Sequence, residues 1–574
     1  MEKNMNMEQQ NRLQAENDNI SPWRAAWPFW CFLVLVAMVL IPVFIDVIPQ
    51  RDAAFRYAPM AEAFRDGDFT YAFHPRTGFL HTFTAGVFAW LLQCSGFMAC
   101  KLSSMLFIAL PVFPLYGIMR RVYSRFMAEI TTFIFVFASQ LQRLGWSGLR
   151  DSHKCFLLLL SGYALIVIYQ QREKWSGYIW LGVAAGLGIV TRGDLVLFMS
   201  LVFFWGIVME LKLKKLPFRS ICCSVLAVLL ALPAIILNWY LAGVAVPEIR
   251  FAWIFRKLAN RYPGLGDTLL LIGLSLIAAF LAAWAVRRIC DAGFGKILGW
   301  LAAAGLLFLV VRQCCSDDFY LEVPIRVYIG SVVRGFFPVY GGAALIGLGF
   351  RLARKQWIRE ESILLTLLLG HAVLVCSQII LNDNFLYVSS RYLIPAIPLE
   401  LGWSVTGVLV LWEFLTRPFR AGYPRLVQNV GYISFAVAVC VFLHDFYQPV
   451  MREYMREKGR IYREGLARIA ETIRNDYRGP AQFRPEVDPG KYIPKLNPAV
   501  LYLSPNEKKR ELRPDFRRQS ISAFLAKGRV TDKFYEADYV VEKYAENNRL
   551  PDGLLLLREV DLGKEKYRIW KRIK

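Results

Sequence analysis

Long uncharged apolar segments recur along this chain and constrain what it can fold into. Each is roughly 17–22 residues long, the length that crosses a hydrocarbon core about 30 Å thick. Hydrophobic residues make up 56% of the 574 residues and charged residues 20%, a balance more apolar than that of soluble domains. We therefore predict a polytopic α-helical membrane protein. Examples of these segments are Cys31–Ile45, Leu195–Val208, Ser220–Ala242, Thr268–Val286 and Gly431–Leu443 with their flanks.

The net charge of +23 is placed in the connections between apolar segments. In a soluble protein such a charge would suggest nucleic acid, but Lys and Arg also collect in the cytoplasmic loops of membrane proteins. We therefore expect no nucleic-acid partner. Six basic clusters can share the cytoplasmic side with Arg24: Arg120–Arg125, Gln170–Lys174, Leu211–Lys215, Arg287–Lys296, Arg351–Arg359 and Arg417–Arg425.

This arrangement of charge predicts about thirteen spans, with the N-terminus inside and the C-terminus outside. It requires that the apolar segment Phe79–Met98 lie in the outer interface and that the second span start near Leu102. The predicted spans are 27–48, 102–119, 127–144, 152–169, 176–191, 194–210, 218–241, 267–286, 296–312, 327–350, 361–381, 391–413 and 430–447.

Three regions follow from this topology. Residues 1–26 form a cytoplasmic tail whose polar start does not resemble a cleavable signal peptide, so the first apolar segment is a retained anchor. Residues 27–447 form the membrane module, with a first outer loop at 49–101. Residues 448–574 are charged and contain a helical stretch, Met451–Arg474. Four short strand-like runs follow it, which predicts a small α/β domain outside the membrane: Pro498–Leu503, Ala537–Val541, Leu554–Leu557 and Tyr567–Ile569.

The first outer loop carries a carboxylate directly after the first span. Behind Asp52, an apolar stripe at helical spacing predicts an amphipathic helix that lies on the membrane surface and ends at Gly67; the stripe consists of Tyr57, Met60, Ala61 and Phe64. This helix would hold Asp52 at the depth of a lipid phosphate, where it could act as a general base. Alternatively, Asp52 caps the helix or pairs with Arg51.

Three more charged clusters fall on the same predicted outer side. They are GLRDSHK at 148–154, TRGD at 191–194 and SSRYLIPAIP at 389–398. Arg334 lies within the outer half of the tenth span, where a buried charge needs an anionic partner. Guanidinium groups suit a phosphate because their planar fork donates two hydrogen bonds. Each cluster could instead be an ordinary interfacial loop or a helix-ending turn. The candidate residues in the three motifs are Arg150, Asp151, Lys154, Arg192, Arg391 and Tyr392.

Motifs for other chemistries are missing from the sequence. There is no CxxC pair, no Walker loop, no HExxH and no GxSxG. His74 and His81 lie seven residues apart, which supports a metal site only weakly. We therefore predict no metal ligands, although a divalent metal requirement stays open.

These motifs resemble the GT-C glycosyltransferases, in particular the bacterial relatives of protein O-mannosyltransferases and of the lipid A aminoarabinose transferase. The resemblance rests on RDAAFRYAPMAEAFRDGDF at 51–69, GLRDSHK at 148–154, GLGIVTRGDLVLF at 186–198 and SSRYLIPAIP at 389–398. It covers about 27–447. The chain departs from the family pattern at 74–82, where HPRTGFLHT replaces a Pro-rich motif.

The resemblance implies a transferase in a bacterial inner membrane that uses a sugar on a polyprenyl phosphate. The sugar would pass, with inversion, to an acceptor outside the cytoplasm: a protein, lipid A or an envelope glycan. Asp52 and Asp151 match the two catalytic acidic positions. The donor phosphate would be held by Arg391 and Arg192, assisted by Arg334, Arg150 and Lys154, while Tyr57, His74 and Tyr392 would position substrates.

Other classes of function remain possible from the sequence. A transporter or lipid flippase would show inverted repeats and broken spans at matching positions, and we find no such symmetry. A surface-polysaccharide polymerase or ligase would share the donor type on a different fold. A non-catalytic assembly or sensor protein would have no use for Asp52.

Overall fold

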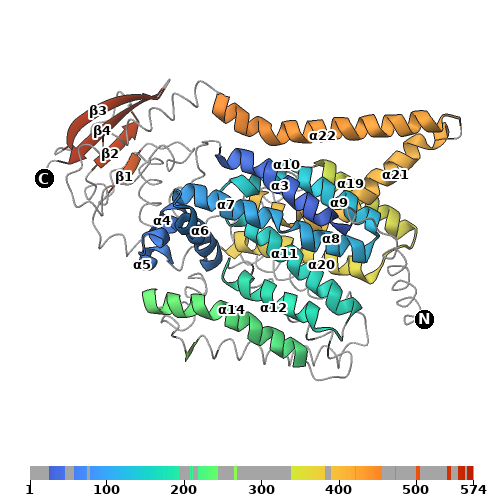
Figure 1. Ribbon diagram of the computed structural model, residues 1–574, viewed down its shortest axis with the longest axis horizontal. Coiled ribbons are helices and arrows are strands. Elements are labelled where there is room, and N and C mark those ends of the chain that lie inside the picture. The colour runs from blue at the N-terminus through green and yellow to red at the C-terminus, as the bar shows by residue number, and fades with distance from the viewer. Residues whose placement is uncertain are drawn as a thin grey trace, which may run out of the picture.

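The computed structural model is mostly helical and describes part of the chain (Figure 1). The described residues are 25–44, 53, 57–73, 78–171, 173–192, 195, 207, 210, 218–242, 264, 266–267, 270, 338–381, 390–420, 422–455, 472, 500–503, 539–543, 554–562 and 565–572.

The first half of the described chain supplies ten helices. They are α3 (Trp27–Phe44), α4 (Ala58–Arg65), α5 (Phe69–Ala72), α6 (Phe79–Leu92), α7 (Gly96–Ala109), α8 (Val112–Val122), α9 (Arg125–Phe137), α10 (Ser139–Trp146), α11 (Asp151–Gln170) and α12 (Trp175–Ile189). The later elements are α14 (Phe218–Ala242), α19 (Pro338–Ala353), α20 (Arg359–Leu381), the 3₁₀ helices η2 (Ser390–Tyr392) and η3 (Ile394–Leu399), α21 (Leu401–Arg420) and α22 (Pro424–Met455).

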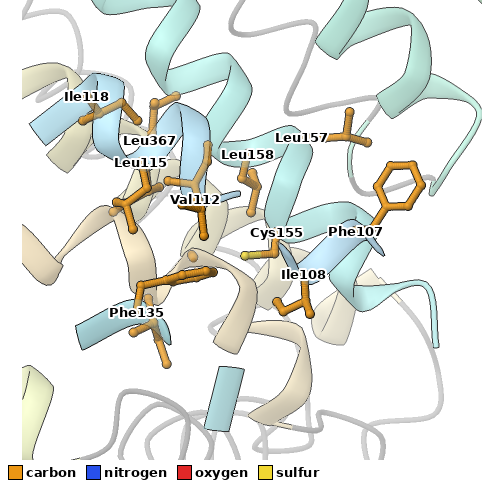
Figure 2. Packing of buried hydrophobic residues seen from close by; sticks show 14 of the residues in the cluster. Phe107, Ile108, Val112, Leu115, Ile118, Phe135, Cys155, Leu157, Leu158 and Leu367 are labelled. Atoms are coloured by element: carbon orange, nitrogen blue, oxygen red, sulfur yellow. The ribbon is translucent and has the colours of Figure 1, made fainter. Parts of the chain in front are cut away.

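Five stretches of helix in the described residues are long and apolar enough to cross a membrane. They are Trp27–Phe44, Gly96–Val122, Asp151–Gln170, Phe218–Tyr240 and Pro424–Val441. Helix α11 is the central one, since 83% of its apolar window is buried inside the protein. Figure 2 shows Cys155, Leu157 and Leu158 of this helix among the apolar side chains of α7, α8, α9 and α20. These helices confirm the prediction of a helical membrane protein.

The two ends of α11 lie at different sets of charged residues. Asp151 begins the helix. The helix has 20 residues and is therefore about 30 Å long. At its other end, the Gln170 side chain hydrogen-bonds to Arg121 at 3.3 Å and to Glu360 at 3.0 Å. The predicted cytoplasmic clusters at Arg120–Arg125 and Arg351–Arg359 therefore meet at one end of the bundle, and the predicted outer motifs meet at the other.

A buried carboxylate joins several helices at the predicted cytoplasmic end of the bundle. Glu361 is fully buried and pairs with Arg351 at 2.6 Å. The same Oε1 atom accepts hydrogen bonds from Tyr123 at 3.1 Å and from the indole of Trp403 at 3.0 Å. Four helices, α8, α19, α20 and α21, thus converge on one charge-assisted network.

Helix α4 matches the predicted amphipathic helix but packs on protein. Its apolar residues Tyr57, Met60 and Ala61 are buried. A Cβ added at Gly86 would lie 2.3 Å from the Phe64 ring, and one at Gly96 would lie 2.0 Å from the Ala58 carbonyl oxygen, so these glycines let α6 and α7 approach α4 closely. Gly67 ends the helix with a φ of +79°, as predicted.

Several predicted element boundaries differ from the structure. The second span starts at Gly96 and not at Leu102, because the Ser95 hydroxyl caps the helix by accepting from the Met98 amide. The third predicted span, 127–144, breaks at Ala138 into α9 and α10. The twelfth opens as 3₁₀ turns containing Pro395 and Pro398, residues that cannot donate α-helical hydrogen bonds.

Other predicted boundaries are extended or lie outside the description. Helix α22 continues past residue 447 to Met455 without a break. Most residues of the predicted spans 194–210, 267–286 and 296–312 lie outside the described residues, as does the start of 327–350.

The C-terminal region contains a four-stranded antiparallel sheet in the order β1-β2-β4-β3. Its strands are β1 (Val500–Leu503), β2 (Tyr539–Lys543), β3 (Leu554–Leu562) and β4 (Glu565–Arg572), each overlapping a predicted strand-like run. The helical stretch Met451–Arg474 is described only to Met455, within α22, and at residue 472. An α/β domain at 448–574 therefore stays a prediction.

Helices α19 and α21 cross at glycines. A Cβ added at Gly347 would lie 2.0 Å from the Trp403 carbonyl oxygen, and one at Gly407 would lie 1.9 Å from that of Ala343. Small residues at a crossing allow backbones to touch, which is how helices commonly associate in lipid.

Gly347→Ala is expected to destabilise the protein by about 1–3 kcal/mol, since a methyl group has no space at this crossing. Gly349→Ala on the same helix is the matched control, because nothing lies within 4 Å of its added Cβ. Thermal unfolding in detergent measures both. Equal melting temperatures for the two variants would contradict the close crossing.

Cysteine labelling tests the predicted sidedness of the two helix-bundle ends. Asp66 follows α4 and Lys174 precedes α12, and both side chains are exposed. In a cysteine-free background, Asp66→Cys should react with a membrane-impermeant maleimide on intact cells. Lys174→Cys should react only after the membrane is opened. The reverse pattern would overturn the predicted topology.

Candidate functional site

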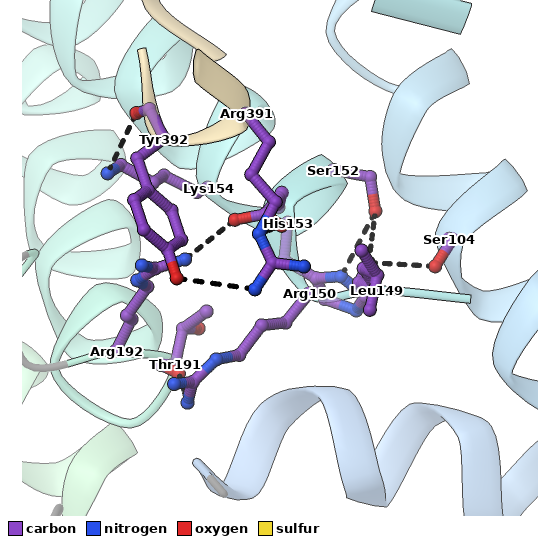
Figure 3. Close-up of polar contacts among 11 residues, drawn as sticks. Ser104, Leu149, Arg150, Ser152, His153, Lys154, Thr191, Arg192, Arg391 and Tyr392 are labelled. Atoms are coloured by element: carbon purple, nitrogen blue, oxygen red, sulfur yellow. Dashed lines mark hydrogen bonds and ion pairs between the residues drawn. The ribbon is translucent and has the colours of Figure 1, made fainter. Parts of the chain in front are cut away.

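The first turn of α11 holds a buried carboxylate between two arginines. Asp151 is 2% exposed. Its Oδ1 lies 2.6 Å from Nη1 of Arg192, and its Oδ2 lies 3.8 Å from Nε of Arg391. Arg192 follows the end of α12, and Arg391 belongs to η2. The Asp151 carboxylate therefore joins three segments that are far apart in the sequence. Figure 3 shows Arg192 and Arg391 of two of these segments on either side of Tyr392.

Tyr392 orients both guanidinium groups. The Cζ atom of Arg192 lies 4.3 Å from the centre of the Tyr392 ring, and that of Arg391 lies 5.1 Å from it. Arg391 also donates a 3.3 Å hydrogen bond to the Tyr392 hydroxyl. Cation–π contacts of this kind favour fixed guanidinium positions. Lys154, fully buried, donates to the Tyr392 carbonyl at 3.4 Å and completes the group.

Arg150 and the residues that begin α6 both contact the end of α12. Nη1 of Arg150 donates to the Thr191 carbonyl at 3.1 Å, next to Arg192. Gly78, just before α6, sits against the same peptide: its added Cβ would lie 2.2 Å from the Thr191 oxygen, and its φ of +77° favours glycine. The start of α6 thus packs on the end of α12, where the Leu80 amide donates to the Val190 carbonyl at 3.3 Å.

Two buried histidines lie beside Arg150, and sequence reasoning did not single out their pairing. The rings of His81 and His153 are 4.9 Å apart, edge to face, and Tyr57 meets His81 at 4.8 Å. Nε2 of His153 lies 3.2 Å from the hydroxyls of both Thr84 and Ser103. Burial, and secondarily the Arg150 charge, lower the pKa of His81 to about 3, so this ring is neutral at physiological pH.

The structure brings together six of the ten predicted site residues: Arg150, Asp151, Lys154, Arg192, Arg391 and Tyr392 (Figure 3). Tyr57 instead packs in the interface of α4 with α6 and α7, against His81. Asp52, His74 and Arg334 lie outside the described residues. Within the described part of the chain, no group of three or more His, Cys, Asp or Glu side chains could hold a metal ion.

Comparison with known proteins gives matches only among solved structures. No family model and no curated protein matches the sequence. The fold is similar to an apo oligosaccharyltransferase of Archaeoglobus fulgidus, with a TM-score of 0.48 and 12% identity over 80% of this chain and 59% of that one. This chain thus spans 59% of the length of the archaeal enzyme.

A second similar structure is ArnT from Cupriavidus metallidurans bound to undecaprenyl phosphate. The TM-score is 0.43 and the identity 14%, over 78% of this chain and 80% of that one. The apo form of the same protein gives 0.41 and 12%, over 94% and 97%. The archaeal enzyme and ArnT are GT-C glycosyltransferases, the group that the sequence motifs resemble.

Removing the Asp151 charge should destabilise the end of the bundle at which α11 begins. Asp151→Asn leaves the buried Arg192 without its carboxylate, and breaking a buried pair costs about 3–5 kcal/mol. Adding Arg192→Gln in the same chain should recover part of this loss. Thermal unfolding of the two single variants and the double variant measures the coupling, and purely additive losses would contradict a direct Asp151–Arg192 interaction.

Proposed function

We propose that this protein is a glycosyltransferase that moves a sugar from a polyprenyl phosphate to an acceptor outside the cytoplasm, with inversion at the anomeric carbon. The observation that carries the proposal is the cluster at the start of α11, where Arg192 and Arg391 contact the Asp151 carboxylate. Arg150 and Lys154 add two more cationic side chains, which donate to the Thr191 and Tyr392 carbonyl oxygens beside these arginines. The net positive charge of these five side chains suits a phosphate group at the membrane interface.

The buried setting of the cluster supports a role toward a charged lipid phosphate. Arg150 and Arg192 are only 6% and 5% exposed. Cations held in such a low-dielectric place, already oriented by Tyr392, stabilise negative charge without reorganising. In the proposed reaction the bond between the anomeric carbon and the phosphate oxygen breaks. The leaving phosphate gains the electron pair, and Arg192 and Arg391 stabilise it.

The acceptor supplies the new bond to the anomeric carbon and loses a proton. We assign the proton to Asp52, which follows the first span in the same predicted outer loop as Gly78, a residue that packs against Thr191 beside the Asp151 cluster. Asp151 has both carboxylate oxygens directed at guanidinium groups. We therefore assign it a positioning role, holding the two arginines, in place of the direct catalytic role that the motif suggested.

The remaining assignments follow from the motifs. Tyr57 and His74 would position the acceptor, and Arg334 would assist at the donor phosphate. The acceptor would be a protein, lipid A or an envelope glycan. The chain would lie in a bacterial inner membrane, with residues 448–574 outside it.

Transfer from labelled donors tests this function. Purified membranes would receive polyprenyl-phosphate-linked mannose, glucose and aminoarabinose, each radiolabelled in the sugar. Asp52→Asn should lower transfer by about 10²–10⁴-fold, as expected for a lost general base. Arg391→Lys should lower turnover by about tenfold or more, because an ammonium group cannot reproduce the guanidinium fork.

Lys174→Gln is the matched control, since this exposed residue lies at the far end of α11 from Asp151. It should retain wild-type transfer. Undiminished transfer in Asp52→Asn would remove the general-base assignment. A protein that consumes none of the donors in any form would contradict the glycosyltransferase proposal and favour a transporter of lipid-linked compounds.

A further inference from the structure

The hairpin formed by α21 and α22 exposes an apolar surface that ends in a basic turn. Its turn lies at the end of the molecule opposite the C-terminal sheet (Figure 1). Large apolar side chains on both helices are 54–75% exposed around it: Phe414, Leu415, Phe419, Tyr423, Leu426, Tyr432, Ile433 and Phe435. A patch of this kind is typical of a membrane-contacting surface.

The turn lies at the depth of the predicted cytoplasmic interface. Phe435 of α22 packs against Phe133 of α9, with ring centres 5.2 Å apart. Arg125, at the start of α9, is 8 residues back from Phe133, or roughly 12 Å along a helix, and Pro424 is 11 residues back from Phe435, or roughly 16 Å. Both helices thus begin near the level of the Arg120–Arg125 cluster.

The turn is positively charged, with exposed arginines. Arg417 and Arg425 are both exposed, and neither forms an ion pair within the described part of the chain. Glu413 lies one helical turn before Arg417 but does not pair with it. In the sequence, a third arginine, Arg420, lies between Arg417 and Arg425. Basic side chains beside an apolar, membrane-level surface attract anionic headgroups, by about a factor of five per residue.

A pocket of about 410 Å³ opens between the two helices beside this turn. Trp412 lies on α21, and Gln428, hydrogen-bonded to the Tyr432 hydroxyl at 2.9 Å, lies on α22. Gly431 lets Trp412 approach, since an added Cβ would lie 3.2 Å from its ring. The walls are mainly apolar. The lining residues are Trp412, Pro424, Val427, Gln428, Gly431 and Tyr432.

We propose that the α21–α22 turn is a binding site for an anionic phospholipid. Arg417 and Arg425 bind the headgroup phosphate, and the pocket between Trp412 and Tyr432 receives the adjoining acyl chain. The exposed arginines supply the charge complementarity, and their position at the interface matches that of a headgroup. This site is separate from the donor site, because it lies at the other end of the helix bundle from Asp151.

Quenching of Trp412 by brominated lipid tests the site. The full-length protein is placed in phosphatidylcholine bilayers that contain a low fraction of phosphatidylglycerol, with bromine on the acyl chains of one lipid at a time. The chain has 16 tryptophans, so subtracting the signal of Trp412→Phe isolates this residue. Per mole of quencher, brominated phosphatidylglycerol should quench Trp412 roughly tenfold more strongly than brominated phosphatidylcholine.

Arg417→Gln combined with Arg425→Gln should abolish this preference. Lys174→Gln combined with Lys355→Gln removes the same charge from exposed positions elsewhere and should leave the preference intact. Equal quenching by the two lipids in the wild-type protein would overturn the proposal. Resistance to both lipids would also overturn it, because the pocket would then be covered by a second copy or another protein segment.

Discussion

The salt bridge between Asp151 and Arg192 joins the segments that meet at one end of the helix bundle. It is 2.6 Å long and buried, and it fixes the start of α11 to the end of α12. Arg391 reaches the same carboxylate from η2, and Tyr392 stacks on both guanidinium groups. Charges buried in a low-dielectric place must find partners, so these segments cannot separate without a large loss of free energy.

The opposite end of the bundle follows the same principle with a different carboxylate. The Glu361 carboxylate binds the side chains of Arg351, Tyr123 and Trp403 and so joins helices that are distant in sequence. Between the two polar ends, α11 is surrounded by apolar side chains (Figure 2). Within the described residues, the apolar packing around α11 separates these two polar networks, and each network holds together the helix ends that meet there.

Small residues decide how closely the remaining helices approach. Gly347 and Gly407 bring the backbones of α19 and α21 together, and Gly96 does the same for α4 and α7. Helices in lipid gain little from burying apolar surface, so close backbone contact and hydrogen bonds provide much of the packing energy. Helix α4 is held in this way against α6 and α7.

The sequence by itself determined the helical membrane class, the two sets of charged clusters and six of the residues that gather at Asp151. Those features are local: an apolar run of membrane length and a charge at its end are readable without neighbours. Only the tertiary structure decided that Asp151 is enclosed by Arg192 and Arg391 and that His81 meets His153. It also decided that α7 begins at Gly96, capped by Ser95, and that η3 interrupts the predicted twelfth span. Contacts between distant segments depend on side-chain packing in three dimensions, and no pattern along a single chain specifies them.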